Sequence, residues 1–93
     1  MILEVAVLNV KEGCGPKFEQ SFEFASSIIK SMKGYINHEL KKCIERENQY
    51  ILLVNWECLE DHEEGFRKSG EYQKWKELLH HFYEPFPEVL HYS

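Results

Sequence analysis

Two segments of the chain read as strands that carry apolar residues on both of their faces. In residues 2–10, one alternation carries Leu3, Val5 and Val7, and the other carries Ile2, Ala6, Leu8 and Val10. Residues 50–58 begin in the same way, with Tyr-Ile-Leu-Leu-Val. Successive side chains of a strand point to opposite faces of its sheet, so both faces of this sheet must be covered. One helical layer covers only one face, which predicts a second copy of the chain on the other.

A different spacing, with apolar residues three and four positions apart, predicts a helix between Pro16 and Gly34. Proline suits a first helical position, and glycine is common just after a helix ends. The expected buried stripe is Phe18, Phe22, Ala25, Ile29 and Met32. This stripe would pack the helix on one face of the sheet.

Two further helices are expected in tandem in the second half of the chain. The first covers residues 59–68, with Cys58 as its expected N-cap, and the second follows Ser69, a good N-cap residue. The second helix carries an inward stripe of Tyr72, Trp75, Leu79 and Phe82 and is expected to end before Pro85 and Pro87. The aromatic content of this stripe makes it part of the core or the wall of a pocket.

The remaining strands complete one fold. Residues 35–44 and 50–58 read as an antiparallel hairpin, and residues 89–92 read as a short edge strand. The order strand, helix, strand, strand, helix pair, strand predicts an α+β protein with a ferredoxin-like split βαβ arrangement. We expect one domain over residues 1–93, with an antiparallel four-stranded sheet and its helices on one face.

Composition narrows the possible partners and location. The 93 residues carry a formal charge of −5 with scattered Lys and Arg, which disfavours a nucleic-acid partner. Three cysteines without a Cys-x-x-Cys spacing suggest neither a disulfide framework nor a zinc site and fit reduced thiols in the cytoplasm. The apolar start of the chain is too short to span a membrane. We therefore expect a cytoplasmic protein without a membrane anchor.

Several short sequences resemble one protein family. They are Val10-Lys11-Glu12-Gly13, Gly34-Tyr35, Trp56-Glu57 and Leu59-Glu60-Asp61-His62, with a C-terminal stretch over residues 78–87 similar to one bacterial subgroup. They resemble the antibiotic biosynthesis monooxygenase family of dimeric α+β barrels. The resemblance implies a pocket between the helices and one sheet face, with a twin subunit on the other face.

The resemblance leaves two kinds of function open. The first is a cofactor-independent monooxygenase that acts, as a homodimer, on a small aromatic such as a quinol or polyphenol. The second is a non-catalytic dimeric module that binds a small molecule or serves in a stress response. Haem degradation is not expected, because the Asn, Trp and His of the haem-degrading branch correspond to Ala6, Gly65 and Trp75 here.

Two residues are candidates for catalysis. Oxygenation without a cofactor needs a group that accepts a phenolic proton, and His62 titrates in the right range. Tyr72 lies on the inward stripe of the last helix, where its hydroxyl can donate a hydrogen bond. The alternative for His62 is a surface or capping histidine among acidic neighbours, and for Tyr72 it is simple packing.

Four further residues are candidates for binding the aromatic ligand: Trp56, Trp75, His38 and Phe66. Trp56 offers an aromatic wall and an indole N–H, although strand aromatics are more often core. His38 shares the alternation of Leu40 and hence a buried face, where a core or dimer-interface histidine is the usual case. No metal is expected, because the Glu77–His80 pair lacks the second pair that di-iron sites use.

Overall fold

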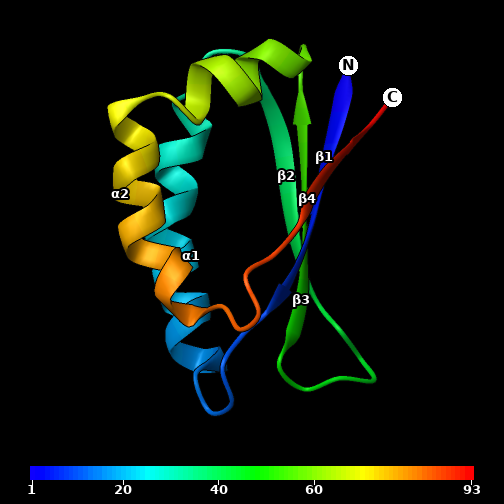
Figure 1. Ribbon diagram of the computed structural model, residues 1–93, viewed down its shortest axis with the longest axis vertical. Coiled ribbons are helices and arrows are strands. Elements are labelled where there is room, and N and C mark those ends of the chain that lie inside the picture. The colour runs from blue at the N-terminus through cyan, green and yellow to red at the C-terminus, as the bar shows by residue number, and fades with distance from the viewer.

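The computed structural model describes residues 1–93 and consists of two layers, a four-stranded sheet and a group of helices that covers one face of it (Figure 1). The strands are β1 (Ile2–Asn9), β2 (Tyr35–Lys42), β3 (Gln49–Trp56) and β4 (Val89–Tyr92). The helices are α1 (Gly15–Lys30) and α2 (Gly70–Leu79), with the short turns η1 (Asp61–Phe66) and η2 (His80–Phe82). The strand order β2-β3-β1-β4, antiparallel throughout, confirms the expected ferredoxin-like α+β fold.

The register of the sheet sorts side chains onto its two faces. Ala6 of β1 lies opposite Leu52 of β3, and both are buried beneath the helices. On the other face, Val7, Leu90 and Tyr92 are exposed. The helices of one chain therefore bury the face that carries Ala6 and Leu52 and leave the face that carries Val7 exposed.

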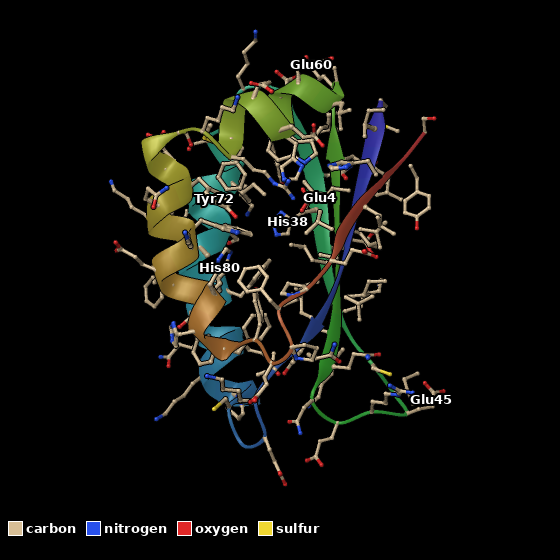
Figure 2. The ribbon with its side chains drawn as sticks, in the orientation of Figure 1. Glu4, His38, Glu45, Glu60, Tyr72 and His80 are labelled. Atoms are coloured by element: carbon tan, nitrogen blue, oxygen red, sulfur yellow. The ribbon has the colours of Figure 1, made fainter.

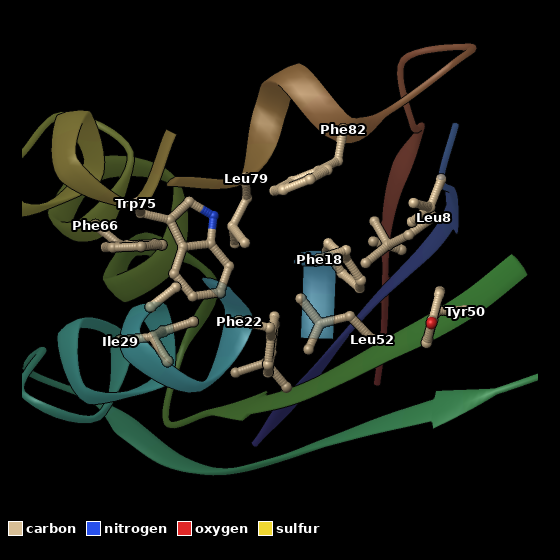
Figure 3. Packing of buried hydrophobic residues seen from close by; sticks show 14 of the residues in the cluster. Leu8, Phe18, Phe22, Ile29, Tyr50, Leu52, Phe66, Trp75, Leu79 and Phe82 are labelled. Carbon is tan, nitrogen blue, oxygen red and sulfur yellow. The ribbon is translucent and has the colours of Figure 1, made fainter. Parts of the chain in front are cut away.

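The core lies between the two layers, where side chains from the sheet meet those from the helices (Figure 2). Fifteen buried apolar residues form one cluster, which the close view of Figure 3 shows. The expected helical stripes take part in it: Phe18, Phe22, Ala25 and Ile29 of α1, and Trp75, Leu79 and Phe82 from α2 and η2, are buried. No helix of the protein combines the length and the apolar run needed to cross a membrane.

The helix ends follow the expected chemistry at some positions and not at others. Ser69 caps α2 as expected, because its Oγ accepts a 3.1 Å hydrogen bond from the Tyr72 N–H. Cys58 directly precedes the second helical stretch as expected, because this stretch begins with Leu59 and passes into the π-helical turn η1 at Asp61. Its thiol does not cap the backbone, however, and instead donates to the Asp61 carboxylate at 3.1 Å. A thiol is a weak acceptor for backbone N–H groups, which fits this outcome.

The end of α1 and the start of β2 are joined by a tight turn at Gly34. The helix ends at Lys30, earlier than the glycine, and Gly34 itself has a φ of +84°. A Cβ there would lie 2.1 Å from Oδ2 of Asp61, so both the backbone conformation and the close approach of η1 require glycine. This turn fixes η1 against the end of the sheet.

Candidate functional site

A cavity of about 440 Å³ lies between the sheet and the helices. Nine of its fourteen lining residues are hydrophobic, and its size falls within the range of roughly 300–1,000 Å³ typical of small-molecule pockets. Figure 2 shows Tyr72 and His80 on the helical side of this space and Glu4 on the sheet side. The cavity is therefore an apolar chamber with a few polar groups on opposing walls.

Glu4 is the most unusual of these polar groups, because it is an acid almost completely buried on an otherwise apolar alternation of β1. Its Oε1 accepts a 2.9 Å hydrogen bond from Nε1 of Trp56. Burial raises the pKa of Glu4 to about 7, against the smaller lowering effects of the Trp56 hydrogen bond and the positive charge of Arg67. The carboxyl group therefore changes charge near neutral pH.

His62 lies next to Glu4 and enters the cavity from η1. Its Nε2 is 3.3 Å from Oε1 of Glu4, and its ring stacks on Trp56 with centroids 5.3 Å apart and planes at 22°. Burial, with smaller contributions from Arg67 and His91, lowers the pKa of His62 to about 3. At neutral pH this imidazole is uncharged.

The turn η1 is a short π-helical segment, which explains how two of its side chains reach the cavity. The Arg67 N–H bonds to the carbonyl of His62, five residues earlier, at 3.0 Å. This wider turn leaves His62 and Phe66, which are four residues apart, both buried and both in the cavity wall. Such π-helical turns occur often at functional sites.

Aromatic side chains form the wall around Phe66. Its ring meets Tyr72 at 5.2 Å and 89° and Trp75 at 5.5 Å and 80°, both edge-to-face arrangements. Burial raises the pKa of Tyr72, and the nearby charge of Arg67 opposes that rise. The Tyr72 hydroxyl therefore stays protonated at neutral pH and can donate a hydrogen bond.

Four of the six residues expected at the site line the cavity: His62, Phe66, Tyr72 and Trp75. Trp56 is fully buried behind the cavity and contacts its wall through the hydrogen bond to Glu4 and the stacked ring of His62. His38 lies on β2, where its Nδ1 shares a 2.6 Å hydrogen bond with the Tyr35 hydroxyl and its ring contacts Phe22. It is not part of the lining.

Sequence reasoning missed Glu4, Arg67 and His91. Glu4 had a visible signal, since it is the one acid within the apolar alternation of residues 2–10. His91 had none, because its place beside His62, at 2.7 Å, depends on how β4 pairs with β1. No group of three or more His, Cys, Asp or Glu side chains is arranged to hold a metal ion.

Fold and cavity together define a small α+β protein with an apolar pocket between its layers and a titratable acid in the pocket wall. The chain belongs to the antibiotic biosynthesis monooxygenase family, whose model matches residues 1–78. Most of the residues that build the cavity fall inside this match.

Individual relatives and solved structures resemble the chain over nearly its whole length. YczJ of Bacillus subtilis strain 168, an uncharacterised protein, is 58% identical over 93 residues, which are 100% of this chain and 98% of YczJ. A solved structure from Bordetella bronchiseptica, named for the same family, has a TM-score of 0.95 and 29% identity and covers 99% of this chain and 94% of that one. SnoaB of Streptomyces nogalater, a cofactor-independent oxygenase, has a TM-score of 0.86 at 15% identity and covers 99% of this chain and 90% of SnoaB. The last likeness is one of fold.

Proposed function

We propose that the protein is a cofactor-independent monooxygenase of a small phenolic aromatic, such as a quinol, with Glu4 as its general base. The observation that carries the proposal is the buried Glu4 carboxyl group in the cavity wall, whose pKa of about 7 suits proton exchange at neutral pH. Membership of the monooxygenase family and the fold shared with SnoaB support the same class of reaction.

The reaction balances without an external reductant. A quinol and O₂ give a hydroxyquinone and water, so one oxygen atom enters the ring and the other leaves in water. Glu4 accepts the phenolic proton, and the resulting phenolate passes one electron to O₂. The two radicals join to form a carbon–oxygen bond, and the protonated peroxide then loses water. The substrate supplies all four electrons that O₂ takes up.

The other lining residues have matching roles. Phe66 and Trp75 provide flat apolar surfaces against which an aromatic ring packs. Arg67 also lines the cavity, and its positive charge stabilises a phenolate or a reduced oxygen species. The Tyr72 hydroxyl donates a hydrogen bond to the same anion.

Glu4 is a better base than its neighbour His62. A pKa of about 3 means that His62 does not hold a proton as a cation at neutral pH, because burial and the charge of Arg67 oppose it. The carboxyl group of Glu4, in contrast, passes between its two charge states near pH 7. His62 thus stays in the site as a neutral partner of Glu4.

The active protein in this proposal is a cytoplasmic homodimer joined through the open face of its sheet. Val7, Leu90 and Tyr92 are exposed on that face, although they belong to apolar strands. Pairing two such faces removes this apolar surface from water. The three cysteines are free, which suits a reducing compartment.

The proposal is tested by oxygen uptake with menadiol and by the incorporation of one ¹⁸O atom from ¹⁸O₂ into the product. We expect Glu4→Gln to lower kcat by about 100-fold or more and Tyr72→Phe by less. His81→Gln is the control, since His81 is an exposed histidine outside the cavity. Uptake by the wild type that does not exceed autoxidation would exclude this activity on quinols. Quenching of tryptophan fluorescence by menadione without uptake would indicate the binding module instead.

A further inference from the structure

A second histidine, His91, connects the cavity to the surface. It comes from β4, where it lies directly opposite Glu4 in the strand register. Its Nε2 is 2.7 Å from Nδ1 of His62, and its Nδ1 is 3.9 Å from Oε1 of Glu63. Together with the 3.3 Å contact between Glu4 and His62, these distances form one unbranched line of four titratable side chains.

The line runs from the interior to solvent. The side chains of Glu4 and His62 are only 7% and 4% exposed, whereas those of His91 and Glu63 are 16% and 43% exposed. Three elements contribute to it, β1, η1 and β4, so no single helix or strand accounts for the alignment. Such a line gives the buried Glu4 carboxyl group a path along which its proton exchanges with solvent.

The short distance between the two imidazoles restricts where their protons are. A neutral imidazole carries one N–H, and a 2.7 Å contact between two ring nitrogens requires one donor and one acceptor. If Nδ1 of His62 donates to His91, then Nε2 of His62 faces Glu4 as an acceptor and Nδ1 of His91 carries its proton toward Glu63. If Nε2 of His91 donates instead, every proton in the line points toward Glu4.

We propose that Glu4, His62, His91 and Glu63 form a proton relay between the cavity and solvent, in which the two neutral histidines exchange tautomers together. The relay deepens the proposed function and rests on it for its use in catalysis, while its proton chemistry is independent of any substrate.

One transfer moves a proton across each junction and leaves no net charge on the histidines. The Glu4 carboxyl proton passes to Nε2 of His62, and the Nδ1 proton of His62 passes to Nε2 of His91. The Nδ1 proton of His91 passes to solvent water, because Glu63, at 3.9 Å, is too far for a direct hydrogen bond and receives the proton only through that water. Glu4 is then an ionised base, ready to accept the phenolic proton of a quinol. The reverse shift reprotonates Glu4 for the next step.

Burial and the charge of Arg67 keep both histidines neutral, as the relay requires. Arg67, on the same turn as His62, lowers the pKa of both His62 and His91, and burial lowers each of them more. Glu63 opposes this effect on His91. The other elements packed around the relay add no charge to it. Trp56 of β3 donates its indole N–H to Glu4, and the Tyr72 hydroxyl of α2 stays protonated and therefore neutral.

The relay is tested first without substrate, by ¹⁵N NMR of the imidazole nitrogens. We expect His62 and His91 to change from the Nδ1–H to the Nε2–H tautomer together, with one midpoint near pH 7, and this joint change to be absent in Glu4→Gln. His81→Gln should leave it intact. Histidines that change separately, keep one tautomer from pH 5 to 9, or still change together in Glu4→Gln would overturn the proposal.

A second test measures the relay during turnover of menadiol. We expect His91→Gln to lower kcat about tenfold with an unchanged KM, and added imidazole to restore the rate of His91→Ala. An unchanged kcat, or a loss that imidazole does not restore in a variant with wild-type urea stability, would contradict a relay role. If the wild type consumes no oxygen, the proposed function fails, whereas the NMR experiment still decides whether the relay exists.

Discussion

The indole Nε1 of Trp56 donates a 2.9 Å hydrogen bond to Oε1 of Glu4, and both side chains are buried between the sheet and the helices. This bond satisfies the tryptophan N–H and holds the carboxyl group in place, but one donor does not replace the water that an ionised carboxylate loses. The acid is thus fixed in position while its charged form remains costly.

That cost should make stability depend on pH through Glu4. Its pKa is raised from 4.5 to about 7, so its contribution to stability is complete below pH 4.5 and is lost as the pH rises to 7. Glu4→Gln keeps an oxygen for the Trp56 bond but has no charge to bury. The free energy of unfolding of Glu4→Gln should therefore rise, relative to that of the wild type, by about 1.4 kcal/mol for each pH unit between pH 4.5 and 7. Urea unfolding at pH 4.5, 5.5 and 7 measures this, and a pH-independent difference would show that Glu4 ionises freely.

His62 should give the opposite pH dependence. Its pKa is lowered from 6.5 to about 3, so its contribution to stability is complete above pH 6.5 and is lost as the pH falls toward 3. The advantage of the wild type over His62→Gln should shrink by about 1.4 kcal/mol per pH unit as the pH falls through this range. The same urea series measures it, with His81→Gln as the exposed control. A larger wild-type advantage at pH 4 than at pH 7 would contradict the assignment.

Gly34 should not tolerate a side chain. Gly34→Ala places a Cβ at a φ of +84° and 2.1 Å from the Asp61 carboxylate, so we expect a loss of about 2 kcal/mol or more in the free energy of unfolding. Gly70→Ala is the matched control, because a Cβ there meets nothing within 4 Å. Thermal and urea unfolding compare the two variants. Equal losses in both would mean that the turn is not specific for glycine.

The open sheet face should carry the dimer. Val7→Lys puts a charge on this face, and burying it against a second copy should raise the Kd of the dimer at least about tenfold. Phe24→Lys is the control, since Phe24 is 66% exposed on α1, which covers the opposite face of the sheet (Figure 1). Sedimentation velocity over a dilution series measures both. A Val7→Lys protein that dimerises like the wild type would move the interface elsewhere.

The elements of the fold were predictable because each depends on local spacing. The four-and-three pattern of Phe18, Phe22 and Ile29 specifies a helix face, and Ser69 specifies a cap, whatever the rest of the chain does. The helix after Cys58 also begins where expected, but its spacing did not predict that it widens into the π-helical turn η1 from Asp61 onward. Of the site, the sequence indicated the residues on periodic faces, such as Tyr72 and Trp75.

The sequence by itself therefore determined the strands, the helices and the inward apolar stripes of α1 and α2, since all of these follow from periodicity. Only the tertiary structure decided that Glu4, His62 and His91 meet. They lie far apart in the chain, and their contact depends on the pairing of β4 with β1 and on the turn that carries η1 over the sheet. Their altered pKa values arise from that burial, which local sequence does not encode.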